Sequence, residues 1–155
     1  MATPTQETAL YVHDDSGTPS VVEIGCPTSI SGAGATQESI ETTCLSDKSR
    51  QYIPGLSSPG ELSFDVRFDT GNTSHMLLET MRKNRTTAAW AIGFSDGDEE
   101  PTFAEDKLTF TSRSGIAFNG FITSVEFSFE QNSVVSASVG IQITGEVEVS
   151  KASAA

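Results

Sequence analysis

The stretch that decides the fold is NSVVSASVGIQITGEVEVS, residues 132–150, in which apolar and small polar side chains alternate. Because successive side chains of a β-strand point to opposite faces, this pattern predicts a strand with one apolar and one small, polar face. The apolar parity consists of Val135, Ala137, Val139, Ile141, Ile143 and Val147. A strand of about fifteen residues spans roughly 50 Å, whereas ordinary strands have about five to six residues. We therefore expect it to be longer than its own core requires.

A second long alternating segment, GIAFNGFITSVEFSFE (115–130), comes just before this strand. We expect QNS (131–133) to form the turn, so that the C-terminal third is a long antiparallel hairpin. One parity of the segment is expected to face inward, and it consists of Phe121, Val125, Phe127 and Phe129. The other parity carries Ser124, Glu126, Ser128 and Glu130, together with the apolar exception Ile122. Residues 114–150 contain no Lys, Arg, Asp or His.

The polar face of this hairpin has two interpretations. An amphipathic sheet normally exposes its polar face to solvent, and Ser and Thr suit strands. Exposed sheets and edges, however, usually carry Lys, which protects the edges from pairing with other chains. Long edges without Lys favour pairing with other copies, and a cyclic assembly would leave no edge open. The inner surface of such a ring would be smooth and weakly negative.

The N-terminal part is expected to form short strands and a long loop. ALYVH (9–13), SVVEIGC (20–26) and SIETTCL (39–45) are predicted strands, and SISGAGATQ (29–37) a flexible connection. The segment SDKSRQYIPGLSSPG (46–60) contains two prolines and two glycines, which favours a long loop. Its apolar and basic side chains favour an arm that packs on a neighbouring molecule; they are Lys48, Arg50, Tyr52, Ile53 and Leu56.

The middle of the chain predicts a strand, one helix and a further strand. ELSFDVRF (61–68) alternates, and a helix over 73–84, capped by Thr73 or Ser74, follows it. The basic cluster at the end of this helix suits the helix dipole better than it suits a nucleic-acid patch. The alternation of TTAAWAIGF (86–94) predicts a strand with Trp90 in the core. SDGDEEPTFAED (95–106) is expected to be an acidic loop, and it lacks the calcium-ligand pattern. KLTFTS (107–112) is a predicted strand.

Composition limits the classes of function. The chain has 155 residues, 21 acidic and 9 basic, and a net charge of −12, which excludes nucleic-acid binding by phosphate neutralisation but allows nucleic acid as a passenger. No secretion signal or membrane-length apolar run is present in the sequence. Cys26 and Cys44 are expected to be buried free thiols in strands, with a disulfide as the alternative. We expect neither a metal ion nor a cofactor.

The order of these segments over residues 9–149 resembles the major tail tube protein of long-tailed, lambda-like bacteriophages (siphoviruses). The most specific parts are ELSFDVRFDTGNTSHMLLETMRKN and FNGFITS, the latter after an Asp-Gly turn. The resemblance implies a mainly β fold, a β-sandwich or partial barrel with a long C-terminal hairpin and one short helix, related to type VI secretion tubes. It also implies one tail tube domain over 1–155, with flexible ends at about 1–8 and 150–155.

The same resemblance implies a structural role in the virion tail. Family members form stacked hexameric rings, and the tube delivers DNA to the host as a passenger that is not bound. The loop 46–60 would contact the adjacent ring through Lys48, Arg50, Tyr52, Ile53 and Leu56. The hairpin 118–148 would line the lumen with Ser124, Glu126, Ser128, Glu130, Ser136, Ser138, Gln142, Thr144, Glu146 and Glu148.

Implied partners are a tape measure protein inside the tube before DNA, the tail tip and tail terminator proteins, and no membrane. Assembly would occur in the cytoplasm of the host bacterium. The alternatives are a tube protein of a contractile tail or type VI-like secretion system, and a non-enzymatic cell-surface binding β-sandwich. An enzyme is not expected, because no nucleophile elbow, metal-binding helix or paired-carboxylate motif is present.

Overall fold

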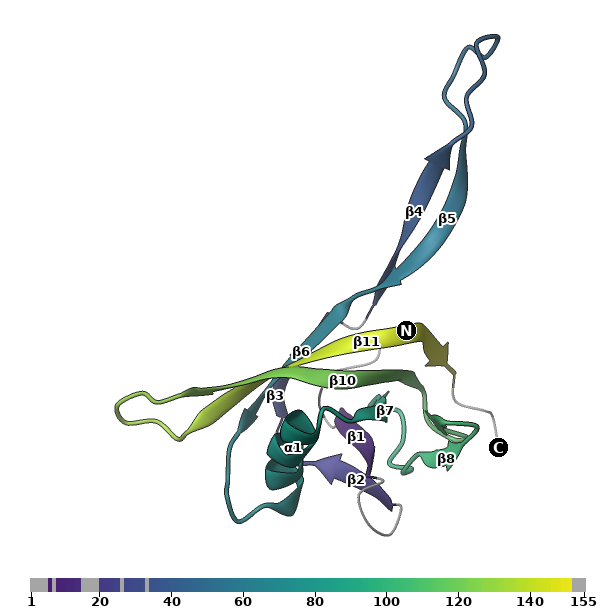
Figure 1. The fold of residues 1–155 in the computed structure, drawn as a ribbon. Helices are drawn as coiled ribbons and strands as arrows, with labels where there is room; N and C mark the ends of the chain where they lie inside the picture. Colours follow the sequence, from purple (N-terminus) through teal and green to yellow (C-terminus); the bar gives the residue numbers. More distant parts are fainter. Residues whose placement is uncertain (1–5, 7, 15–19, 26, 33, 152–155) are drawn as a thin grey trace.

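The computed structural model describes residues 6, 8–14, 20–25, 27–32 and 34–151 (Figure 1). It is mainly β with one helix, as predicted from the sequence. The elements in chain order are β1 Ala9–Asp14, β2 Ser20–Ile24, β3 Pro27–Ser31, β4 Ala35–Glu41, β5 Tyr52–Pro59, β6 Glu61–Arg67, α1 Thr73–Asn84, β7 Thr87–Gly93, β8 Thr102–Ala104, β9 Lys107–Thr109, β10 Gly115–Ser128 and β11 Ser136–Ser150. Cys26 and most of the expected flexible ends lie outside the described residues, and Ser150 still belongs to β11.

One seven-stranded antiparallel sheet forms the body, in the order β2-β1-β7-β10-β11-β6-β3. This sheet curls: Phe64 of β6 and Trp90 of β7 are separated by two strands, yet their ring centroids lie 6.4 Å apart. The helix α1 packs on the inner face of the curl beside β10 (Figure 1). Two smaller sheets are the hairpins β4–β5 and β8–β9.

The core lies inside the curl, where the predicted alternation places it. β6 contributes Leu62, Phe64 and Val66, each at most 1% exposed. β11 contributes Ala137, Val139, Ile141 and Ile143, also at most 1% exposed. Trp90 is fully buried, as predicted, and its indole N–H donates to the carbonyl of Gly120 at 3.2 Å. Strands β6 and β11 therefore both turn their apolar side chains toward this core.

The predicted parity of β10 is wrong for Phe121 and Ile122. Ile122 is 5% exposed in the core, while Phe121 is paired with Gln142 on the opposite face. The cause is a β-bulge at Thr123, because Ile122 pairs with Ile141 and Ser124 already pairs with Gly140. An extra residue in one strand reverses the parity of everything that follows. Val125 and Phe127 consequently face the core side, as the sequence predicted.

The helix α1 begins one residue after its cap, Asn72, rather than at a cap on Thr73 or Ser74. The Asn72 Oδ1 accepts hydrogen bonds from the Ser74 N–H at 3.0 Å and the Ser74 hydroxyl at 2.7 Å. Leu78 and Met81 are buried on the predicted face. The imidazole of His75 links the helix to the segment after β2, with Nε2 donating to the Gly25 carbonyl at 2.6 Å.

The acidic loop 95–106 is bound to its own chain rather than simply solvated. Glu99 Oε2 accepts from the N–H groups of Thr111 at 2.9 Å and Ser112 at 2.6 Å, and these bonds lower the pKa of Glu99. Asp96 accepts similarly from the Ser114 N–H at 3.0 Å. The predicted strand 107–112 ends at Thr109. Among the described residues, no cluster of three His, Cys, Asp or Glu side chains could hold a metal ion.

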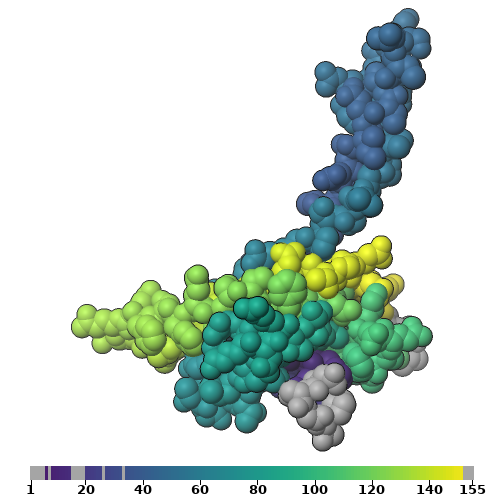
Figure 2. Space-filling model, in the orientation of Figure 1, coloured from purple at the N-terminus to yellow at the C-terminus, as the bar shows by residue number. Residues whose placement is uncertain are grey.

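Two hairpins extend beyond this body (Figure 2). One is β4–β5, which we call the arm (35–59), and the other is the tip of the β10–β11 hairpin (129–135). The expected loop at 46–60 is therefore wrong over Tyr52–Pro59, which form strand β5. The expected connection at 29–37 also contains the end of β3 and the start of β4. Prolines at 54 and 59 are tolerated because the two-stranded arm leaves one edge of each strand without a partner.

Candidate assembly surfaces

The arm carries apolar side chains that have no core beneath them. Every residue of β4 is exposed. Ile40 is paired with Ile53 across the two strands, and both are about half exposed, at 51% and 49%. Tyr52 is 53% exposed and Leu56 82%. Ile40 is the member of this apolar set that sequence reasoning missed, because its strand partner could not be identified before the hairpin was known.

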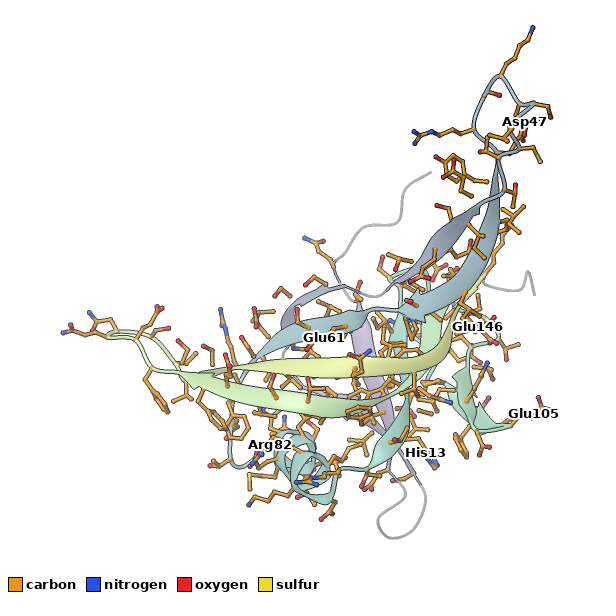
Figure 3. All side chains as sticks on the ribbon, turned by 45° about the horizontal axis from the view of Figure 1, so that its top comes forward. His13, Asp47, Glu61, Arg82, Glu105 and Glu146 are labelled. Carbon is orange, nitrogen blue, oxygen red and sulfur yellow. The ribbon has the colours of Figure 1, made fainter. Side chains whose placement is uncertain are left out.

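The outer end of the arm is an ordered turn. Asp47, labelled at this end in Figure 3, accepts a hydrogen bond from the Cys44 N–H at 2.8 Å, and its own N–H donates to the Cys44 carbonyl at 3.0 Å. The Thr43 hydroxyl accepts from the Gln51 N–H at 2.9 Å. Cys44 is exposed in this turn, so the prediction of a buried thiol in a strand is wrong for it. Lys48 and Arg50 are exposed in the same turn.

The base of the arm depends on glycine. Gly32 has φ +87°, and a Cβ there would lie 2.4 Å from the carbonyl oxygen of Glu61. The Gly60 N–H donates to the Gly34 carbonyl at 3.1 Å, which joins the two strands where they leave the sheet. These contacts fix the direction of the arm relative to β6, because glycine alone fits such a close crossing without strain.

The polar face predicted for the hairpin is broader than the hairpin. Glu126 is paired with Ser138, Ser138 with Asp65, and Asp65 with Ser29, so one row crosses β10, β11, β6 and β3. A second row joins Ser124, Gly140, Ser63 and Ser31. The outward residues of β6 and β3 were missed as members of this face, because strand neighbours cannot be identified from alternation alone. We call this four-stranded surface the polar face.

Hydrogen bonds within the polar face engage several of its serine hydroxyls. Asp65 accepts from the hydroxyl of Ser138 at 2.5 Å and from that of Ser29 at 2.9 Å. The hydroxyls of Ser31 and Ser63 are 3.1 Å apart. Four serine hydroxyls of the face, those of Ser29, Ser31, Ser63 and Ser138, are therefore engaged within the sheet. The polar face carries one basic side chain, which the hairpin itself does not supply. It is Arg67 of β6, which lies on this face because it is paired with Ser136.

Of the predicted lumen residues, Ser124, Glu126, Ser128, Ser136, Ser138, Gln142 and Thr144 share the polar face by register. Glu130 is exposed in the loop beyond β10. Glu146 follows Gly145, whose φ is +78°, within an irregular part of β11 (Figure 3). Glu148 forms an ion pair with Lys107 of β9 at 2.6 Å, which raises the pKa of Lys107. The two last glutamates thus lie beside the β8–β9 hairpin.

The polar face ends on both sides in a strand edge without a partner in the described structure. β7 pairs with β10 only from Gly115 to Phe121, so β10 beyond Ile122 has β11 on one side alone. On the other side, β3 is the last strand. Neither edge contains a Lys, which would oppose pairing with another chain. Both edges of this mainly β sheet are therefore open to pairing with a strand of another chain.

Comparison with known proteins identifies the family. The sequence model described as "Phage tail tube, TTP, lambda-like" matches residues 1–153. "Structural protein 3" of Pseudomonas phage PAJU2 is 37% identical over 147 residues, which cover 91% of this chain and 89% of that protein. The chain belongs to the lambda-like phage tail tube family, and it is a structural protein of the virion tail. The family assignment gives no better support to the contractile-tail or surface-binding alternatives.

Solved structures agree in fold. The SPP1 tail tube protein superposes with a TM-score of 0.70 at 14% identity, covering 98% of this chain and 81% of that one. The tail of an empty GTA particle, solved with C6 symmetry, gives a TM-score of 0.69 at 13% identity, covering 97% of this chain and 100% of that one.

Within the described residues, no helix is both long and apolar enough to cross a membrane.

Proposed function

We propose that six copies of this protein form a ring in which the polar faces join into one continuous β-barrel. The observation that carries the proposal is the pair of open edges at β3 and at β10 beyond Ile122. The four strands of the face alternate in direction, so β10 and β3 run oppositely. Pairing of β10 with β3 of the next copy therefore keeps every neighbouring pair antiparallel, and closure removes both of these edges. The C6 symmetry of the GTA tail supports the number six.

The polar face would then line a channel through which DNA passes without being bound. Its residues are the seven predicted lumen residues that share the polar face, and Ser29, Ser31, Ser63, Asp65 and Arg67 join them; Glu130, Glu146 and Glu148 would lie at the ends of the channel. DNA carries about one negative charge per 1.7 Å of its axis, so a face that carries acidic side chains and few cations offers its phosphates little to bind. The same channel would hold a tape measure protein before DNA enters.

In this proposal the arm joins one ring to the next through Lys48, Arg50, Tyr52, Ile53 and Leu56, together with Ile40. The whole chain acts as one tube domain, and its role is structural rather than catalytic. A tail tip protein would nucleate the first ring and a terminator would cover the last, with assembly in the cytoplasm of the host bacterium and no membrane partner.

Electron microscopy of the purified protein at rising concentration tests the ring. We expect monomers or weak oligomers when dilute, and sixfold rings or tubes when concentrated or nucleated by tail tip components. A variant with Thr28→Lys and Ser31→Lys, two exposed positions on the β3 edge, should remain folded and form no rings, because Lys opposes strand pairing. Thr36→Lys, on the arm, is the matched control. Monodisperse monomers of the unaltered protein under all conditions would contradict the proposal.

A further inference from the structure

Two exposed apolar surfaces lie at opposite ends of one continuous ribbon. The first is the arm stripe, which consists of Ile40, Ile53 and Leu56. The second is the tip groove, a hollow of about 440 Å³ beside the hairpin tip, lined by Phe68, Asp69, Thr70, Phe127, Phe129 and Val135. Exposed apolar patches on a soluble protein mark contact sites. Each of these two surfaces therefore needs an occupant.

The arm stripe is built by strand register and one bulge. Ser39 is paired with Pro54 and Gln37 with Ser57, so Gly55 and Leu56 both oppose Glu38. Two residues against one keep Leu56 on the face that carries Ile40 and Ile53. A Cβ on Gly55 would lie 3.2 Å from Ile40 Cγ1, so glycine lets the strands close up beneath the stripe. The stripe is thus a narrow, continuous apolar ridge.

The tip groove has a rigid floor and an open top. Phe68 packs edge-on against Phe127, with ring centroids 4.9 Å apart, and the Phe68 N–H donates to the Val135 carbonyl at 2.9 Å. Phe129 is 76% exposed and Val134 59%. An apolar ridge fits such a groove, because both surfaces lose apolar area to water when they meet.

The arrangement of the two surfaces favours a second copy as the occupant. Gly60 alone separates β5 from β6, so the ribbon runs from the arm directly to Phe68 at the groove. The arm and the hairpin tip project in different directions from the body (Figures 1 and 2). A contact between unlike ends of identical molecules is heterologous, and repetition produces an open, growing filament.

Charge supports the same occupant. The turn of the arm exposes two basic residues, Lys48 and Arg50, beside one acidic residue, Asp47, while the tip exposes Glu130 and the groove includes Asp69. No Lys, Arg or His occurs between residues 114 and 150. We infer that the tip groove of one copy receives the arm stripe of a copy in the neighbouring ring. This inference rests on the proposed stacking of rings by the arm, and it adds the receiving site.

Disulfide mapping in assembled tubes tests the inference. In a Cys26→Ser, Cys44→Ser background, Leu56→Cys protein is mixed with Phe129→Cys protein, polymerised and oxidised. We expect a cross-linked dimer of the two variants in tubes and not in isolated rings. Leu56→Cys mixed with Thr80→Cys is the matched control, because Thr80 lines a separate, larger groove beside α1.

The outcomes separate this inference from the proposed function. Tubes that cross-link through Thr80 instead of Phe129, or through Phe129 already in isolated rings, would overturn the inference and leave the tube intact. Failure of the unaltered protein to form tubes would instead contradict the proposed function.

A charge exchange provides a second measurement. Lys48→Glu or Glu130→Lys alone should slow tube elongation by about tenfold, and the two together in one chain should restore it. Equal loss in the double variant would also overturn the assignment of the groove.

Discussion

The arm and the C-terminal hairpin are both antiparallel ribbons with apolar side chains, yet only one of them has a core. β11 buries Ala137, Val139, Ile141 and Ile143 inside the curl of the sheet. The arm exposes Ile40, Ile53 and Leu56 by 49% to 82%, and all of β4 is exposed. The hydrophobic effect stabilises the fold in the first ribbon. In the second it is available only to an assembly.

The comparison teaches that secondary structure alone does not reveal whether an apolar side chain is buried in the core of the monomer or in a contact between molecules. The arm is held by its backbone ladder and by the Asp47 and Thr43 hydrogen bonds of its turn, so it keeps its shape without burying its apolar face. A surface that is ordered before contact loses little conformational entropy on binding. Such an arm suits assembly for that reason.

The largest difference between the two ribbons is expected when one isoleucine side chain in each is shortened to alanine. Ile141→Ala should destabilise the monomer by about 2–5 kcal/mol, because it leaves a cavity in a fully buried site. Ile53→Ala should change stability by about 0.5 kcal/mol or less, because the side chain is half exposed. Denaturant unfolding of dilute monomer measures both. Similar losses from the two variants would show that the arm supports the fold.

A second variant tests the arm from the side of assembly. Replacing Tyr52, Ile53 and Leu56 with Ser should leave the monomer folded and abolish stacking of rings into tubes. The reason is that these side chains have intermolecular rather than intramolecular partners in the proposed assembly. Circular dichroism checks the fold, and electron microscopy counts tubes.

Deletion of residues 47–57 should have the same effect as the triple variant. The matched control replaces Gln37 and Ser58 with Ala, polar positions nearer the base of the same arm. Tubes of normal length from either the triple or the deletion variant would remove the arm from the stacking contact.

The sequence predicted the hairpin well and the arm poorly, for a physical reason. Alternation is strong in β6 and β11 because one face of each strand is buried. In the arm, Pro54, Gly55 and Pro59 conceal the strand, and no buried parity reveals it. The bulge at Thr123 has no signature in composition, so the parity of Phe121 and Ile122 was predicted wrongly.

Only part of the candidate surfaces could be predicted, because the sequence of one strand does not reveal its neighbours. The small polar side chains of β11 are visible in its sequence, but their neighbours Asp65 and Ser29 join the face only through pairing between distant segments. The Asn72 cap was missed because Thr73 and Ser74 are equally good capping residue types. Pairing and curl are tertiary properties that single-strand periodicity does not encode.

A third prediction concerns the polar face of the hairpin. Ser136→Lys with Thr144→Lys, both on the internal strand β11, should allow tails to assemble and should slow DNA release several-fold at low salt, because each copy adds two phosphate contacts. The delay should shrink as salt rises, since counterions compete for the phosphates. DNA release from intact mutant virions, triggered in vitro at two salt concentrations, measures it.

The neighbouring position Ser138 gives the matched control for this face. A lysine there would lie beside Asp65, which now accepts the Ser138 hydroxyl at 2.5 Å, so part of its charge would be neutralised. Ser138→Lys should therefore slow release less than Ser136→Lys does. Release at unchanged speed in all these variants would mean that DNA does not meet this face.

The smallest expected effect comes from the far end of the hairpin, where β11 is linked to β9 by the Lys107–Glu148 ion pair, while the arm ends in solvent. Glu148→Gln should lower the Tm of the monomer slightly, because both side chains are partly exposed and water screens the pair. The pair raises the pKa of Lys107 above its ordinary value of 10.5, so its contribution is fully present below that pH and is lost as pH rises through the raised pKa. The Tm difference between the two proteins should therefore be constant from about pH 6 to about pH 9, decline above about pH 10.5, and shrink in high salt. Calorimetry of the unaltered protein, Glu148→Gln and the loop control Glu130→Gln measures it. A difference that grows with salt, or one that Glu130→Gln reproduces, would show that the ion pair does not hold this end of the ribbon.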